Sequence, residues 1–405
     1  MKNFKNYLVI IGAGIEMIQM YLEAKKLGLL VVGTDQNPKA PAFKFANKKL
    51  LCSTRDVSET LKKVNRFSKK HKVIGVTTSS NDVPLTVAKV AKSLNLKSIS
   101  IKNAKISSNK LYMKKFFSKF KIPSSKFFTI KTLKGLKKLK NLKFPIIIKP
   151  LDGRGSRGVT FHTNHSKVLW ALHHAKKQSD LNEVLIEEYE YGNQLSVEGF
   201  VYKKKYYPIA FADRDYSNLK FTKPYIIEKG GNTPSTISKK KEKIINNLCK
   251  KIVKSLNLDS GSIKFDIVIN KNKVKVIEFA LRLSGGFWSS NIIPKVYNIN
   301  LTKLSILNSI KNKIQPELLM PKKNNFVVNR YVFANKKGKF LGIENVKKNK
   351  NLLYFKSNIK KNTHVLSQTT HHAERLATFA CYDKTLKLTL KRIAQIEKKM
   401  KLLIK

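Results

Sequence analysis

The chain has 405 residues, of which 42% are hydrophobic and 26% are charged, so it is long enough for two or three folded domains and is not a disordered sequence. Its 82 lysine and arginine residues against 25 acidic residues give a net charge of +57, which could indicate nucleic acid, an anionic membrane or phosphate-bearing substrates as partners. Because the lysines are scattered through every segment together with Asn and Ile, we attribute the charge to a genome rich in those codons and do not expect nucleic acid as a partner.

The cysteines and the apolar runs indicate in which cellular compartment the protein resides, and both point to a reducing one. Cys52, Cys249 and Cys381 lie far apart, and no two of them have metal-ligand spacing, which argues against a disulfide framework. The apolar run that begins at Tyr7 is too short for a secretion signal, and no stretch approaches 18 consecutive apolar residues. We therefore expect a cytoplasmic protein without a membrane span.

Strand and helix patterns alternate over the first hundred residues. Apolar runs predict strands at Tyr7–Ile11, Leu29–Val32 and Val73–Thr77, with a helical pattern between the first two. This βαβ rhythm predicts a Rossmann-like parallel, doubly wound sheet. The turn at Gly12 and Gly14 suits a phosphate, but Met17 occupies the place of the third glycine of the dinucleotide fingerprint. A purely structural turn is at least as well supported.

The remaining elements follow from apolar periodicity. Residues 106–143 read as helical and basic, and the last residues read as a basic helix capped by Asp383. The other predicted elements are a strand at 144–149, a helix at Ser166–Lys177, strands at Val184–Tyr189, Leu195–Val201, Tyr206–Phe211, Ser262–Ile269 and Val274–Leu283, a helix near Ser238–Leu256, and strands at Asn329–Ala334 and Leu376–Tyr382.

A lysine and a glycine-rich loop form the first candidate site. Lys149 ends a short apolar strand, and the loop after it contains Gly153, Gly155, Ser156, Arg157 and Gly158. Glycines let a backbone close over an anion, and a lysine supplies a point charge to phosphate. The order of a Walker loop is absent. The alternative is a mobile surface loop.

Two acidic residues form the second candidate site. If the strands around 266 and 278 pair as a hairpin with a three-residue turn at 271–273, Ile267 faces Ile277 and Asp266 lies directly across from Glu278. Their Cβ atoms would be about 5 Å apart, a spacing at which a hard divalent ion such as Mg²⁺ or Mn²⁺ favours carboxylate oxygens. A two-residue turn would break these alignments. The alternative is that both acids pair with lysines.

Arg282 completes this second candidate site. It has the same parity as Glu278 on the same predicted strand, so it faces the same side. Two acids for a metal, an arginine for phosphate and a glycine loop together indicate a site for a nucleoside triphosphate.

In motif order the chain resembles the ATP-grasp carboxylate–amine ligases over nearly its whole length. The matching segments are Gly12–Gly14, Gly33–Pro38, Ser79–Asp82, Asn109–Lys110, Phe144–Gly158, Leu185–Gly192 and Glu278–Gly286. The resemblance implies an α/β and α+β protein of three domains. These are a Rossmann-like domain over residues 1–105, an ATP-grasp module over 106–310 with a mobile lid at about 123–190, and a small α+β domain over 311–405.

The resemblance also implies roles for individual residues. ATP phosphates would contact Lys110, Lys149 and the loop residues Gly153, Gly155, Ser156, Arg157 and Gly158. The adenine would contact Glu187 and the backbone of Glu188 and Glu190. Asp266 and Glu278 would hold Mg²⁺ or Mn²⁺, and Arg282 together with Lys149 would act in catalysis. The implied reaction activates a carboxylate as an acyl phosphate that an amine attacks, and the resemblance also allows a homodimer.

Two residues depart from the family pattern. Gln194 stands where many members have a glutamate that holds the ribose, and Ala280 stands where many have an asparagine beside the second metal acid. Ala280 leaves open a purine-pathway formate- or bicarbonate-activating ATPase. Both departures, with the charge, leave open a degenerate nucleotide- or nucleic-acid-binding protein. His173–His174 and His371–His372 read as weak candidates, and Arg375 as a residue that could reach the site.

Overall fold

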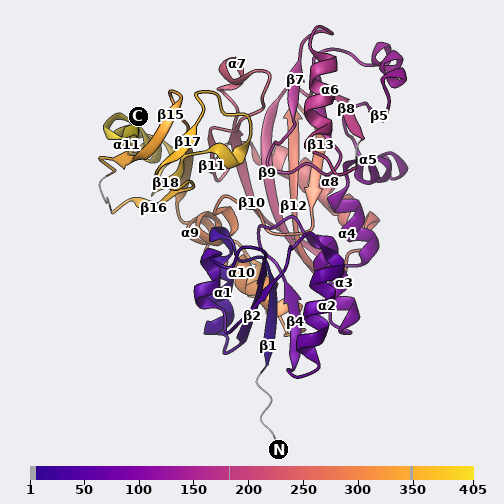
Figure 1. Cartoon of the computed structure of the whole chain (residues 1–405), viewed down its shortest axis with the longest axis vertical. Helices are drawn as coiled ribbons and strands as arrows, with labels where there is room; N and C mark the ends of the chain where they lie inside the picture. Colours follow the sequence, from indigo (N-terminus) through magenta and orange to yellow (C-terminus); the bar gives the residue numbers. More distant parts are fainter. Residues whose placement is uncertain (1–5, 182, 347–349) are drawn as a thin grey trace, which may run out of the picture.

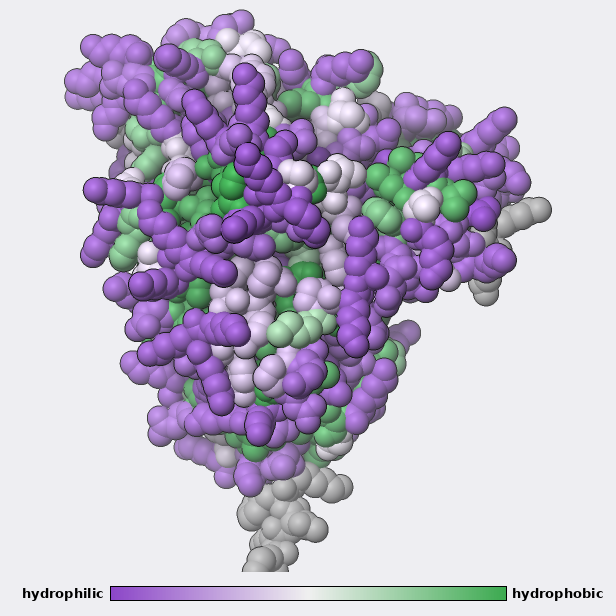
Figure 2. Space-filling model, turned by 180° about the vertical axis from the view of Figure 1, so that it is seen from behind, coloured by the Kyte–Doolittle hydropathy of each residue, from purple (hydrophilic) through white to green (hydrophobic). Residues whose placement is uncertain are grey.

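The structure is a computed structural model that describes residues 6–181, 183–346 and 350–405. The described residues form four β-sheets, and Figure 1 shows the N-terminal sheet at the bottom, the lid at the upper right and the C-terminal region at the upper left. None of the described helices is long and apolar enough to cross a membrane. Figure 2 shows hydrophilic residues spread over the whole visible face instead of gathered in one band.

The first sheet is parallel, as the sequence predicts, but it contains a fourth strand, at Lys48–Leu51, that sequence analysis missed. Its strands run in the order β3-β2-β1-β4, and every adjacent pair is parallel. The strands are β1 (Tyr7–Ile11), β2 (Leu30–Asp35), β3 (Lys48–Leu51) and β4 (Val73–Thr77), and the helices are α1 (Ile18–Lys26), α2 (Val57–Ser68) and α3 (Pro84–Ser93). All five side chains of β1 are buried, because helices cover both faces of a doubly wound sheet.

The second sheet belongs to the lid and has the order β5-β8-β6-β7. Its elements are β5 (Phe127–Ile130), β6 (Ile146–Pro150), β7 (Thr160–His162), α6 (Val168–Lys176) and β8 (Val184–Glu188). The helical prediction for 106–143 is confirmed for α4 (Ile101–Ser108), α5 (Lys110–Lys119) and a 3-10 helix at Leu133–Asn141, and is wrong for strand β5 between them. Aromatic and β-branched residues suit β5, and pairing with the edge of β8 decides its conformation.

The third sheet is antiparallel and has the order β13-β12-β9-β10-β11-β14-β18-β16. It forms the centre of the molecule and lies against α8 (Lys239–Ser255), whose buried residues Ile245, Cys249 and Ile252 join its core. Its strands are β9 (Asn193–Tyr202), β10 (Lys205–Asp215), β11 (Gly230–Thr233), β12 (Gly261–Asn270), β13 (Lys273–Ala280), β14 (Phe326–Val332), β16 (Leu352–Ser357) and β18 (Ala377–Asp383).

The β12–β13 hairpin places Asp266 directly opposite Glu278, but by a different route from the predicted one. Asn270 pairs with Lys273, so the turn has two residues, and Ile267 pairs with Val276 instead of Ile277. The register shift leaves Ile277 as an extra residue in a β-bulge. The prediction that a two-residue turn would separate the acids is therefore wrong, because the bulge restores their alignment.

The C-terminal residues are divided between two sheets. Strands β14, β16 and β18 extend the central sheet, while β15 (Gly338–Glu344), β17 (Thr363–Val365) and β19 (Lys401–Ile404) form a small sheet of order β17-β15-β19. Helix α11 (Leu386–Lys399) is capped by Thr385, whose hydroxyl accepts from the Leu388 N–H at 3.3 Å. The predicted cap, Asp383, instead accepts from the Lys384 N–H and faces Arg392.

Residues on opposite sides of the predicted domain boundaries pack against one another. Helix α4 runs through residue 105, and α10 (Leu301–Ser309) packs on α1 and β4 of the N-terminal sheet. One core contains Leu8 and Met20 together with Leu304 and Leu307, and α9 (Ile293–Tyr297) adds Val296. Residues assigned to the ATP-grasp module thus stabilise the N-terminal sheet, and the boundaries at 105 and 310 stay predictions.

Candidate functional site

A cavity of about 280 Å³ lies between the lid, the central sheet and the start of α5. Most of the predicted site residues line it, although they come from segments up to 172 positions apart in the chain. These residues are Lys110, Lys149, Gly153, Gly155, Ser156, Glu187, Glu188, Glu190, Gln194, Asp266, Glu278 and Arg282. Arg157 does not line this cavity but a neighbouring one, and Gly158 lines neither.

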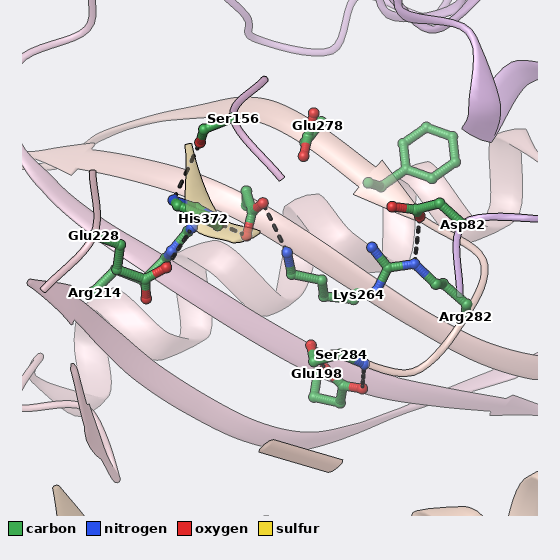
Figure 3. A network of polar contacts seen from close by, with 12 residues as sticks. Asp82, Ser156, Glu198, Arg214, Glu228, Lys264, Glu278, Arg282, Ser284 and His372 are labelled. Carbon is green, nitrogen blue, oxygen red and sulfur yellow. Dashed lines mark hydrogen bonds and ion pairs between the residues drawn. The ribbon is translucent and has the colours of Figure 1, made fainter. Parts of the chain in front are cut away.

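The glycine-rich loop closes one side of the cavity. Gly155 and Gly158 have φ angles of 59° and 70°, in the left-handed region that glycine adopts without strain. Ser156 shares this conformation with a φ of 60°, and its hydroxyl lies 3.2 Å from Nε2 of His372. The His372 N–H also donates to the Gly155 carbonyl at 3.0 Å. The loop is thus held by a residue from the C-terminal region (Figure 3).

His372 is a site residue whose importance the sequence does not reveal. It lines the cavity, and burial together with the nearby Arg375 and Arg214 holds its pKa well below the usual value. The imidazole is therefore neutral at physiological pH. Its neighbour His371, the extended residue before a short 3-10 helix at His372–Glu374, faces Glu374 at 3.5 Å and does not line the cavity.

A buried ion cluster supports the lysine at the end of β6. Glu187 contacts Lys149 through one carboxylate oxygen and Lys114, at 2.7 Å, through the other. Burial alone would raise the pKa of Glu187, but the two lysines lower it to about 2. Because both oxygens are engaged, the predicted contact of this residue with an adenine amino group does not follow from the side-chain geometry. Lys114 is a member of the cluster that sequence analysis missed.

Lys110 connects the loop to the acidic pair. It is the first residue of α5, and its ammonium donates to the Gly153 carbonyl at 2.7 Å and lies 3.9 Å from Glu278. Burial lowers the pKa of Lys110, and the Glu278 carboxylate opposes that shift. The Lys110 ammonium can therefore contact a phosphate in the cavity while its backbone stays in helix α5.

Asp266 is surrounded by cations. One of its oxygens lies 3.2 Å from Arg214, and the other accepts from Lys264 at 2.8 Å. Burial would raise the pKa of Asp266, but Arg214 and Lys264 lower it, so the carboxylate stays ionised. Asp266 thus pairs with a lysine, as the alternative interpretation predicts, and it also lies opposite Glu278.

The acidic pair has oxygens that fit a magnesium ion. The Asp266 oxygen that faces Arg214 is buried and lacks a hydrogen-bond partner among the described residues. Glu278 is 39% exposed through its side chain, and in Figure 3 it lies beside the network with no interaction to the residues drawn. Two opposed carboxylates on adjacent strands offer the oxygen donors that Mg²⁺ prefers, and Arg214, Lys264 and Lys110 are the cations that now face those oxygens.

Arg282 is held in place by a residue of the N-terminal sheet. Its guanidinium contacts Asp82, which follows β4, and donates to the Leu283 carbonyl at 2.8 Å. Burial would raise the pKa of Asp82, but Arg282 lowers it to about 2. Motif order suggests that Asp82 closes the N-terminal domain, but only the structure shows it as the partner of Arg282 (Figure 3).

A second chain of ion pairs extends from the cavity into the C-terminal region. Arg214 donates to Glu228 at 2.9 Å, and Arg375 lies 3.7 Å from the same carboxylate and packs 3.4 Å from the centre of the Tyr331 ring. Arg375 thus does not line the cavity. It contacts Glu228, which in turn contacts the lining residue Arg214. Sequence analysis missed Arg214 and Lys264 because no motif includes them, whereas Glu228 ends a segment, from Lys223 onward, that resembles the pocket border of the amino-acid ligases.

The end of the cavity near β8 contains the predicted adenine contacts. The Glu188 carboxylate accepts from the Lys143 N–H at 2.9 Å, and Glu190 pairs with Lys275 at 2.7 Å. Their side chains therefore hold the strand in place, which leaves base recognition to the backbone, as the resemblance implies. The contacts with adenine and ribose, including that of Gln194, stay predictions.

Comparison with known proteins identifies the domain that carries this cavity. Residues 107–286 match the family model of the ATP-grasp domain, which confirms the predicted resemblance over that range. No curated protein matches the chain.

Solved structures share the fold of the whole chain. An L-amino acid ligase from Bacillus licheniformis is 17% identical with a TM-score of 0.85 over 100% of both chains. A phosphoribosylglycinamide synthetase from Anaerococcus prevotii is 19% identical with a TM-score of 0.76 over 99% of this chain and 100% of that one. An N5-carboxyaminoimidazole ribonucleotide synthetase from Thermotoga maritima is 18% identical with a TM-score of 0.72 over 98% and 99%. The predicted fold class is thereby confirmed.

Proposed function

We propose that this chain, which carries an ATP-grasp domain over residues 107–286, is an ATP- and magnesium-dependent ligase that joins a small carboxylate to an amine through an acyl phosphate. The observation that carries the proposal is the convergence of Lys110, Lys149 and the opposed acids Asp266 and Glu278 on one cavity beneath a glycine loop. Phosphoryl transfer depends on positioning and on neutralising charge on the phosphoryl oxygens, which is what these groups provide.

In this proposal the residues have distinct roles. Lys149 and Lys110 contact phosphate oxygens, and Arg282 stabilises the charge that develops as the substrate carboxylate attacks the γ-phosphorus and ADP leaves. The amine then attacks the acyl carbon and phosphate leaves, which forms the carbon–nitrogen bond. Asp266 and Glu278 would hold Mg²⁺, which when bound neutralises phosphate charge and acts as a Lewis acid. Lys149 is fixed in advance by Glu187.

The structural neighbours support a ligase of this type, because they include an L-amino acid ligase and a phosphoribosylglycinamide synthetase. A second candidate is a bicarbonate-activating ATPase. It is favoured by Ala280 and by neighbours that include the biotin carboxylase domain of a Hydrogenobacter thermophilus 2-oxoglutarate carboxylase in complex with ADP, magnesium and bicarbonate, at 13% identity and a TM-score of 0.75. Formate activation belongs to the same alternative.

The experiment that tests the proposal is a phosphate-release assay with the full chain, ATP and Mg²⁺, across a panel of carboxylates and amines. We expect phosphate release to require one carboxylate and one amine together, and the product to carry a new amide bond by mass spectrometry. Release with bicarbonate or formate but with no amino acid would favour the second candidate. Absence of ADP formation with all substrates, together with salt-sensitive RNA or duplex binding in a filter assay, would contradict both.

A further inference from the structure

We propose that a second cavity, beside the nucleotide cavity and at the edge of the N-terminal sheet, binds an oxyanionic group, a phosphate or a carboxylate, of the amine substrate. This inference rests on the proposed function and extends it to the class of the nucleophile. The cavity has a volume of about 960 Å³ and is lined by the N-terminal sheet, by the start of α3 and by the lid.

The position of the cavity is that of a ligand site in parallel sheets. Its floor is formed by residues at or beyond the carboxyl ends of three strands, namely Asp35 and Gln36 at the end of β2, Ser53–Arg55 after β3, and Asp82 and Val83 after β4. In open α/β sheets, ligands bind in the crevice beyond the carboxyl ends of the strands. The N-terminal domain thus presents its binding edge toward the lid.

Three arginines converge on this cavity without acidic partners. Arg55 extends from the N-terminal sheet, and Arg154 and Arg157 extend from the glycine loop. Among the described residues, none of their side chains forms a hydrogen bond or an ion pair within 4 Å. By contrast, Arg214, Arg282, Arg330, Arg375 and Arg392 each face a carboxylate.

Arginine is also rare in this sequence. The chain has nine arginines among its 82 basic residues, so three arginines at one cavity are not explained by the general excess of lysine. A guanidinium offers a planar fork of donors that matches carboxylate and phosphate oxygens.

The acids on the cavity wall are held mainly by other groups, although the charges of Asp82 and Asp152 also act on Arg154. Asp35 accepts from the N–H groups of Ala13 and Asn37, and Asp152 accepts from the Ser179 hydroxyl and the Asp180 N–H. Asp82 faces Arg282, and Asp180 is exposed.

A helix end adds to the positive potential of the cavity. Helix α3 has ten residues and begins at Pro84, and no side chain caps it at Val83. Val83, Pro84, Leu85 and Thr86 all line the cavity. The first N–H groups of a helix lack partners within it and attract anions, so this end reinforces the three arginines.

The two cavities adjoin, which is what a substrate with one reacting end and one anionic end requires. Asp82, Ser108, Asp152, Gly153 and Arg154 line both. An amine anchored by its oxyanion at Arg55 could therefore direct its nitrogen past Asp82 toward the acyl phosphate beside Arg282. The structure assigns recognition of that anion to Arg55, Arg154 and Arg157.

The test compares Arg55→Gln with Arg66→Gln. Both arginines are exposed, neither has an ion pair among the described residues, and Arg66 does not line the cavity. The full chain is saturated with Mg²⁺ and a non-hydrolysable ATP analogue, so that the nucleotide cavity is filled. Inorganic phosphate, phosphoethanolamine and glycine are then titrated by calorimetry, with ethanolamine and glycinamide as their counterparts without the anionic group.

We expect at least one anionic probe to bind at least tenfold more tightly than its counterpart, and Arg55→Gln to remove that preference while Arg66→Gln keeps it. The probe that binds distinguishes a phosphate from a carboxylate. Equal binding of all probes, or equal loss in both variants, would overturn the inference. Nucleotide binding is measured in the same samples, so its absence would count against the proposed function and not against the anion site.

Discussion

The two adjoining cavities differ in how their cations are arranged. In the nucleotide cavity Lys149, Lys110 and Arg282 each face a carboxylate, whereas Arg55, Arg154 and Arg157 in the neighbouring cavity face none among the described residues. A paired cation is fixed before a ligand arrives, which favours catalysis because little reorganisation remains. A guanidinium that forms no ion pair has its donors available to a ligand, which favours recognition. If both proposals hold, chemistry and selection of the nucleophile occur in different cavities.

The largest expected effect comes from removing both acids of the nucleotide cavity. Asp266→Asn combined with Glu278→Gln should reduce Mg²⁺-dependent ATP turnover by about a thousandfold or more, because transition-state charge loses its counter-ion. Turnover is measured by coupled ADP release at several Mg²⁺ concentrations, and circular dichroism checks the fold. Glu317→Gln, at an exposed acid, should leave turnover unchanged. Survival of turnover in the double variant would show that the metal assignment is wrong.

The buried cluster at β6 and β8 tests whether the ion pair with Glu187 stabilises the buried position of Lys149. Glu187→Gln leaves Lys114 and Lys149 buried without a carboxylate, which should lower the free energy of unfolding by about 3–5 kcal/mol. Urea denaturation measures this loss, with Glu317→Gln as the control. A loss below about 1 kcal/mol would mean that the two lysines find other partners.

The same carboxylate should make stability depend on acid pH. The pKa of Glu187 falls from its ordinary 4.5 to about 2 on folding, so its contribution is fully present above pH 4.5 and is lost as the pH falls toward 2. That difference corresponds to about 3 kcal/mol by proton linkage. Urea denaturation at a series of pH values should show a shallower acid dependence for Glu187→Gln than for the wild type. Parallel curves would contradict the low pKa.

Asp82 stands between the two cavities and so tests whether they work together. Asp82→Asn removes the charge that holds Arg282, and we expect kcat to fall about 10- to 100-fold. Asp82→Glu should recover part of the loss, because it restores the ion pair. An equal loss in both variants, or a change confined to the KM for ATP, would show that Asp82 does not position Arg282.

The smallest effect is expected at the contact between the loop and the C-terminal region. Ser156→Ala removes the hydrogen bond to His372 and should raise the KM for ATP by about 2- to 10-fold, since one neutral hydrogen bond contributes about 0.5–1.5 kcal/mol. Initial rates at varied ATP concentration measure it, and Ser166→Ala, at an exposed lid position, is the control. An unchanged KM would mean that the backbone bond from His372 to Gly155 suffices.

The β12–β13 hairpin, which contains Asp266 and Glu278, shows which features a local sequence pattern can predict and which it cannot. Alternation of apolar residues along two strands determines which side chains share a face, and Asp266 does lie opposite Glu278. The turn length and the bulge at Ile277 were predicted wrongly, because a bulge depends on how the whole hairpin packs in the sheet.

The sequence by itself determined three of the four strands of the N-terminal sheet with the first helix between them, the glycine loop after Lys149 and the acids that follow it. These features are local, since periodicity and glycine content act within a few residues. Only the tertiary structure decided the partners Asp82 for Arg282, His372 for Ser156 and Arg214 for Asp266. Such partners are separated by 52 to 216 residues, and packing of whole elements, which no local pattern encodes, brings them together.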